Sequence, residues 1–299
     1  MTTRRDFLHT SLGAAGMCLP GNRPIAESPN RLAAQSPDRL LARAPTRLKQ
    51  SVCRWPFGSM PDAEFFPMVA RLGFGAVDLL TEKQWPIARD HGLLCSMGTP
   101  TERRDFIRTG LNDRAHHPLL LGELERAITT ARSFGVPNVI AMIGNRDGRD
   151  EEAGLDACVE GLDRVKGLAE SEGVTICLEL LNSRVDHHDF MGDRMRFGLR
   201  LMHAVNSPRV RLLYDIYHMQ IMEGDVIRTI REQGHWIGHY HTAGNPGRNE
   251  LDPTQELNYG AIAAAIAATG FGGWIAHEFI PTRAPEDGLR DAQRICGGG

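Results

Sequence analysis

The chain alternates eight short apolar runs with helix-like stretches, and this alternation restricts its fold more than any other feature. The runs are bounded by Gly, Pro, Asn or Asp and lie at 49–54, 76–80, 93–97, 138–143, 175–181, 210–216, 237–243 and 273–280. Each has the length of a buried strand. Eight strands alternating with helices over about 250 residues predict an α/β fold, a single-domain (β/α)8 TIM barrel. The alternative, a doubly wound open sheet, normally has a Gly-rich dinucleotide loop after its first strand, and this sequence has none.

The intervals between the apolar runs show helical spacing. Phe65, Met68, Val69 and Leu72, for example, fall on one face of a helix. The predicted helices span 61–72, 119–134, 151–172, 190–205, 224–233 and 259–269, and 85–91 is too short to assign from its pattern.

Composition excludes several classes of protein. The net charge of -3 and a pI near 6.5 argue against a nucleic-acid-binding surface, which usually needs a basic face. No apolar run reaches the roughly 18 residues that a transmembrane helix needs. The cysteines after the amino terminus show no C-x-x-C spacing, so we expect them to be small buried hydrophobic residues rather than zinc ligands or redox pairs; they are Cys53, Cys95, Cys158, Cys177 and Cys296.

The amino terminus differs from the rest of the chain. T-R-R-D-F-L at 3–8 precedes a short, weakly apolar run rich in Gly and Ala, and together they resemble a twin-arginine export signal. We therefore expect a signal segment at 1–26, a Pro/Ala/Ser/Arg-rich linker at 27–46 and the barrel at 47–296. The protein would then be periplasmic or otherwise exported. The alternative is a basic tail on a cytoplasmic protein.

Four ionisable residues stand at the predicted carboxyl ends of the last four strands. They are Glu179, Asp215, His241 and Glu278. TIM barrels place their active sites at this end of the barrel, so the four side chains should converge. Three carboxylates and one imidazole suit a divalent cation such as Mn²⁺ or Mg²⁺, and also Co²⁺. Any one of them could instead belong to a buried salt bridge, but four in register on consecutive strands favour a metal site.

Three further residues are candidates for substrate binding, each with an alternative. His218 follows Asp215 by three residues and would contact substrate or support the ligands, unless it is a hydrogen-bonded core histidine. Arg248 could bind a carboxylate with its fork of donors or form a salt bridge within its loop. Asn182 follows the fifth strand and would line the mouth of the barrel.

Long motifs around these residues resemble those of the hydroxypyruvate isomerase family of xylose isomerase-like barrels. They read C-L-E-L-L-N-S-R-V-D-H, L-L-Y-D-I-Y-H-M-Q-I-M-E-G-D, G-H-Y-H-T-A-G-N-P-G-R-N-E and H-E-F-I-P, and the resemblance covers 49–281. By motif position it implies that Glu179, Asp215, His241 and Glu278 hold the metal and that the two glutamates act as the acid/base pair. Hydroxypyruvate isomerases often carry Gln where this chain has His241, whereas the sugar epimerases of the superfamily carry His.

The resemblance implies a metal-dependent isomerase of small α-hydroxy carbonyl compounds that transfers a proton through an enediolate. A sugar 3-epimerase, or a keto-sugar lyase or dehydratase, would use the same metal and the same first proton abstraction. A non-catalytic exported sugar-binding protein has no need for two carboxylates at acid/base positions. A nuclease of the endonuclease IV kind would need more histidine ligands and a basic groove. The sequence does not specify the substrate or the physiological metal. It is compatible with a homo-oligomer as well as with a monomer.

Overall fold

Eight parallel strands close into a barrel in the computed structural model, which describes residues 47–297. Each strand pairs with its neighbours in sequence, and β1 pairs with β8 to close the ring. The prediction of a TIM barrel is thus confirmed. The strands are β1 Lys49–Cys53, β2 Ala76–Leu80, β3 Leu94–Gly98, β4 Asn138–Met142, β5 Thr175–Leu180, β6 Val210–Asp215, β7 Ile237–Thr242 and β8 Trp274–His277.

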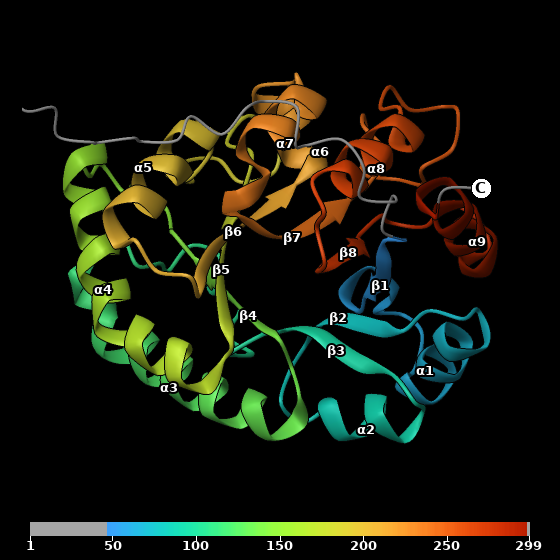
Figure 1. Ribbon diagram of the computed structural model, residues 1–299, viewed down its shortest axis with the longest axis horizontal. Helices are drawn as coiled ribbons and strands as arrows, with labels where there is room; N and C mark the ends of the chain where they lie inside the picture. The colour runs from blue at the N-terminus through green and yellow to red at the C-terminus, as the bar shows by residue number, and fades with distance from the viewer. Residues whose placement is uncertain (1–46, 298–299) are drawn as a thin grey trace, which may run out of the picture. The chain divides into compact units, whose positions relative to one another are not determined.

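Helices surround the strands, as Figure 1 shows. Leucine, valine and phenylalanine side chains fill the layer between helices and strands. The α-helices are α1 Asp62–Arg71, α2 Trp85–Asp90, α3 His117–Phe134, α4 Glu151–Glu172, α5 Met195–Val205, α6 Ile216–Met222, α7 Val226–Gln233, α8 Tyr259–Ala268 and α9 Pro285–Cys296. Three short 3-10 helices are η2 Trp55–Phe57, η3 Arg114–His116 and η4 Gly234–Trp236.

Helix α4 illustrates how local sequence fixes an element. The Asp150 side chain accepts hydrogen bonds from the backbone N–H groups of Glu152 and Ala153, which begins the helix. The helix ends at Gly173, whose φ of 70° is the left-handed conformation that glycine adopts without steric cost. The predicted bounds of 151–172 are those observed.

Two helices were not predicted and one begins later than expected. Helix α6 follows β6 directly, and the apolar residues continue from the strand into the helix. The hydrophobic periodicity therefore does not reveal that a helix begins there. Helix α9 lies beyond the last predicted strand. Helix α5 begins at Met195 rather than at residue 190, because Phe190 instead forms an isolated β-bridge with Asn145.

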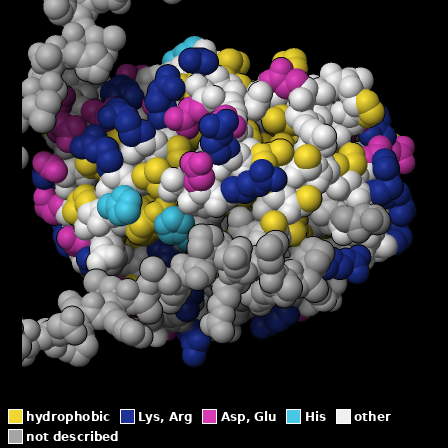
Figure 2. Space-filling model, turned by 45° about the horizontal axis from the view of Figure 1, so that its top comes forward, with side chains coloured by type: hydrophobic (Ala, Val, Ile, Leu, Met, Phe, Trp, Pro, Cys, Tyr) yellow, Lys and Arg dark blue, Asp and Glu magenta, His cyan; other side chains and the backbone are white. Residues whose placement is uncertain are grey.

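The cysteines of the described residues are buried, as expected. Cys53, Cys95, Cys158, Cys177 and Cys296 are free and buried. On the face in Figure 2, basic and acidic side chains are interspersed rather than gathered into one basic patch. Within 47–297, no helix combines the length and the apolar character needed to span a membrane. The predicted export signal and linker lie outside the described residues.

Candidate active site

The structure brings Glu179, Asp215, His241 and Glu278 together at the carboxyl end of the barrel. Each offers one ligand-type atom, and these atoms all lie within 4.8 Å of one another. All four side chains are buried. The strand register produces this convergence, because Asp215 on β6 pairs directly with His241 on β7. Glu278 follows the last residue of β8 and extends the pairing, since its backbone N–H donates to the Thr242 carbonyl at 2.9 Å.

The two carboxylate oxygens of Asp215 have different partners. Its Oδ1 accepts hydrogen bonds from the backbone N–H groups of Tyr217, at 2.8 Å, and His218, at 3.3 Å, and so caps helix α6. Its Oδ2 faces the site, 3.5 Å from the Arg248 guanidinium. The transition from strand to helix therefore fixes the orientation of this carboxylate.

Both carboxylate oxygens of Glu278 accept hydrogen bonds from side chains. Its Oε1 accepts a hydrogen bond from the Trp55 indole at 2.5 Å, and its Oε2 accepts one from Arg248 Nη2 at 2.7 Å. Burial opposes its ionisation, but the charges of His241 and Arg248 outweigh burial and lower the pKa of Glu278 well below its ordinary value. Glu278 is thus held as the carboxylate.

Glu179 and Asp215 have pKa values shifted in the opposite direction. Burial raises the pKa of Glu179, and it raises the pKa of Asp215 to about 8, where repulsion from Glu278 adds to the shift. Within residues 47–297, Glu179 has one ion-pair neighbour, His241 Nδ1, at 3.3 Å. The two glutamates therefore differ in environment, and pairs of groups whose pKa values are pushed apart are typical of acid/base sites.

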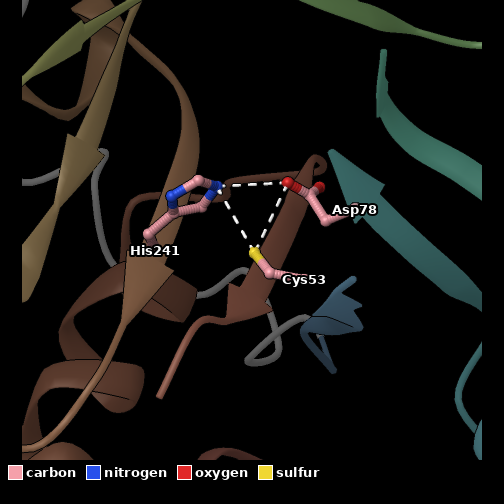
Figure 3. A group of neighbouring side chains, drawn as sticks. All are labelled: Cys53, Asp78 and His241. Carbon is pink, nitrogen blue, oxygen red and sulfur yellow. Dashed lines mark hydrogen bonds and ion pairs between the residues drawn. The ribbon is translucent and has the colours of Figure 1, made fainter. Parts of the chain in front are cut away.

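A fourth carboxylate, that of Asp78 on β2, lies on the far side of the His241 ring. His241 Nε2 lies 3.1 Å from Asp78 Oδ1, and Cys53 Sγ on β1 lies 3.9 Å from the same nitrogen (Figure 3). His239 Nε2 and Ser96 Oγ lie 3.0 and 2.5 Å from Asp78 Oδ2. Burial opposes ionisation of Asp78, but His239 and His241 outweigh burial and lower its pKa. An ionised Asp78 accepts a hydrogen bond from the Nε2–H group and leaves Nδ1 facing the two glutamates.

The buried atoms at the centre of the cluster fit a divalent cation. His241 Nδ1 lies 3.0 Å from Glu278 Oε2, yet among the described residues it has no hydrogen-bond partner of proper geometry. Burial acts against protonation of His241, but Glu278 and its other neighbours outweigh burial and raise its pKa. A cation at this position would replace that proton and neutralise the carboxylates, whose oxygens are the ligands that such cations prefer.

The three predicted substrate-binding residues occupy different places. Arg248 lies in the site, its guanidinium between the rings of Trp55 and Tyr217, with ring centroids at 5.1 and 5.3 Å. His218 is fully buried beside Asp215, with Nε2 3.5 Å from Asp215 Oδ2. Asn182 is buried against His218, with Nδ2 2.6 Å from its Nδ1. His218 and Asn182 therefore support Asp215 and do not line the pocket.

A pocket of about 420 Å³ opens over the cluster. Glu179, Glu278, Arg248 and His187 line one side of it. Sequence reasoning gave no role to Trp55 or Asp78. A lone acidic residue in the apolar run at 76–80 was the available signal for Asp78, but its partners lie on β3 and β7.

We expect Asp78→Asn to weaken Mn²⁺ binding by about 10- to 100-fold, the usual cost of losing a group that orients a ligand. The uncharged amide no longer favours a proton on His241 Nε2. Calorimetric titration with Mn²⁺ measures the affinity. Asp163→Asn is a matched control, because Asp163 is exposed and its ion pair among the described residues is with Lys166. Equal Mn²⁺ affinities for the two variants would show that Asp78 does not orient His241.

Comparison with known proteins places this geometry in a family. The model of the xylose isomerase-like TIM barrel family matches residues 66–296, and the chain belongs to that family. It is 29% identical to the hydroxypyruvate isomerase of Escherichia coli (strain K12) over 207 residues, which are 68% of this chain and 72% of that protein. It is 31% identical to the 2-oxo-tetronate isomerase of Cupriavidus necator over 169 residues, 56% of this chain and 64% of that one.

Among solved structures, an AP endonuclease of family 2 from Brucella melitensis shares the fold, with a TM-score of 0.74 and 24% identity. The match covers 81% of this chain and 97% of that one. Its sequence similarity supports the fold alone. The curated relatives are isomerases, and this chain is an isomerase of the same family.

Proposed function

We propose that this isomerase acts on small α-hydroxy carbonyl compounds and transfers a proton between two neighbouring carbons. The observation that carries the proposal is the convergence of Glu179 and Glu278 on one buried site beneath an open pocket. Two carboxylates with different environments can take a proton at one carbon and return it at the next. Relatives named hydroxypyruvate isomerase and 2-oxo-tetronate isomerase support the same class of substrate.

We propose Glu179, Asp215, His241 and Glu278 as the ligands of a divalent cation, Mn²⁺ or Mg²⁺, with Co²⁺ as an alternative. Such a cation, when bound, polarises the substrate carbonyl and stabilises negative charge on oxygen. His241 would contribute Nδ1, because its Nε2 faces Asp78. The Asp215 oxygen that does not cap α6 would face the cation.

The hydrogen bonds of the two glutamates differ, and this difference supports different roles for them. Glu278 has both oxygens engaged, by Trp55 and Arg248, whereas Glu179 has neither constraint and a raised pKa. We therefore propose Glu179 as the base that removes the proton from the carbon bearing the hydroxyl. Glu278, which begins ionised, would take the hydroxyl proton and deliver it to the former carbonyl carbon. Glu179 would return its proton to the neighbouring oxygen, so that both carboxylates end as they began. Arg248 would attract a carboxylate on the substrate.

A deuterium-exchange screen tests this proposal. The Mn²⁺-loaded protein is incubated in D₂O with hydroxypyruvate, dihydroxyacetone and keto-sugars, and proton NMR identifies the carbon that exchanges. We expect exchange at the carbon next to the carbonyl, together with conversion to the isomer, and neither process in chelator-treated protein. Inversion at C3 of a keto-sugar, without movement of the carbonyl, would instead indicate a sugar 3-epimerase. No exchange with any of these compounds would contradict the proposed reaction.

A further inference from the structure

The pocket over the two glutamates has two chemically different walls. Its polar wall comes from the end of β5 and the segments after β5, β7 and β8, and it carries Glu179, His187, Arg248 and Glu278 beside Leu181. Its other wall comes from the ends of β2 and β4 and from the segment after β3, and it consists mainly of Leu79, Phe106, Ile107, Ile140 and Met142. Among the described residues that line this second wall, none is charged.

Polar partners on the apolar wall are few. Thr81 and Thr99 are the polar residues there among those described, and the Thr81 hydroxyl already lies 3.3 Å from Gln84 Oε1. A substrate that placed several hydroxyl groups against this wall would leave most of them without hydrogen bonds, which is unfavourable for buried polar groups. The wall therefore favours an apolar hydrocarbon group over the hydroxylated end of a sugar.

The backbone conformation of Leu79 also supports an apolar wall. Its φ is 55°, a left-handed conformation that a leucine rarely adopts. The pairing of β2 with β3 shifts register on both sides of Asp78, so this irregularity interrupts the strand next to the pocket. The conformation leaves the half-buried Leu79 side chain lining the pocket. Strained backbone of this kind tends to persist where a site needs a side chain in a particular place.

The volume of the pocket exceeds what a three-carbon acid needs. An apolar cavity of about 150 Å³ is enough to hold benzene. The observed pocket of about 420 Å³ can therefore take an aromatic ring in addition to a hydroxy-carbonyl end.

We propose that the substrate is an α-hydroxy carbonyl compound with a large apolar substituent, about the size of a phenyl ring, packed against Leu79, Phe106, Ile107, Ile140 and Met142. This inference rests on the proposed function, because the reacting end must lie at Glu179 and Glu278. It adds that the opposite end is apolar.

The inference is tested with two compounds that share a hydroxymethyl ketone group and differ in the other substituent on the carbonyl carbon. 1-Hydroxy-4-phenylbutan-2-one carries a phenyl group, and dihydroxyacetone carries only a hydroxymethyl group. For the Mn²⁺-loaded full chain, we expect kcat/KM for deuterium exchange to be at least about tenfold higher with the phenyl compound, since apolar contacts of this size discriminate by 10-fold or more. Binding of both compounds is measured in parallel by calorimetry.

Leu79→Gln locates the effect in the pocket, because glutamine is similar in size to leucine but polar. We expect this variant to lose about tenfold in affinity for the phenyl compound. Leu119→Gln is the matched control, because Leu119 is 50% exposed on α3 and does not line the pocket. It should leave the affinities for both compounds unchanged.

The outcomes separate this inference from the proposed function. Tight binding of the phenyl compound without exchange of either probe would overturn the proposed reaction and support the apolar site. Exchange of dihydroxyacetone at a rate equal to or above that of the phenyl compound, with no tighter binding of the latter, would overturn the inference alone. Equal loss of affinity in Leu79→Gln and Leu119→Gln would also overturn it.

Discussion

Glu179→Gln is expected to lower the rate of deuterium exchange by about 10² to 10⁴, the usual contribution of a positioned general base. The amide keeps an oxygen that can approach a cation, but it cannot accept the proton. Glu278→Gln should behave differently, because Glu278 acts at the second carbon. With hydroxypyruvate, that variant should still exchange deuterium at C3, while conversion to the isomer falls by a similar factor. Proton NMR reports both processes in one sample.

Asp215→Asn is the control that separates ligation from proton transfer. Asparagine caps a helix as well as aspartate does, so α6 should remain in place. Asp215 has no proposed role in proton transfer, and saturating Mn²⁺ should largely restore its activity. If excess Mn²⁺ restores Glu179→Gln as fully as Asp215→Asn, Glu179 is a ligand only and the base is another group.

Arg248→Gln is expected to destabilise the chelator-treated protein by about 3 to 5 kcal/mol, the cost of leaving a buried charge without its partner. The Arg248 side chain is 13% exposed and pairs with Glu278 at 2.7 Å and Asp215 at 3.5 Å. Without it, these carboxylates share the remaining positive charge of His241. Urea unfolding at neutral pH measures the loss.

Saturating Mn²⁺ should recover most of that stability, because the cation supplies the missing positive charge. Arg248→Lys keeps a charge and should lose less. Arg71→Gln is the matched control, since its ion pair with Glu286 is solvent-exposed and contributes only about 0–1 kcal/mol. An equal loss for Arg248→Gln and Arg71→Gln, with and without Mn²⁺, would show that Arg248 does not neutralise the site.

The architecture could be predicted because its signals are local. Each of the eight predicted strands lies within three residues at either end of an observed one, since Gly, Pro, Asn and Asp bound every run. Helix α6 could not be predicted, because Asp215 both ends the strand and caps the helix within one apolar stretch. Helix α9 did carry signals, with Pro285 in its first turn followed by Glu286 and Asp287.

The candidate site could be predicted only for its inner residues. Glu179, Asp215, His241 and Glu278 follow from their strand ends. The side chains that contact these four residues lie far from them in the sequence, so no local sequence pattern predicts those contacts. Trp55 meets Glu278 across 223 residues, and His241 meets Asp78 across 163. His218 is close to Asp215 in sequence and in space, but no local pattern shows that its side chain is fully buried.

The central claim is that one divalent cation binds between the four strand ends. The anomalous scattering of Mn²⁺ in a crystal of the metal-loaded protein tests it directly. We expect a peak roughly 2.0 to 2.6 Å from a carboxylate oxygen of Glu179, Asp215 and Glu278, with His241 Nδ1 as the nitrogen ligand. A peak more than about 4 Å from any of the four, for instance one between Cys53, Asp78 and His241 Nε2, would contradict the claim.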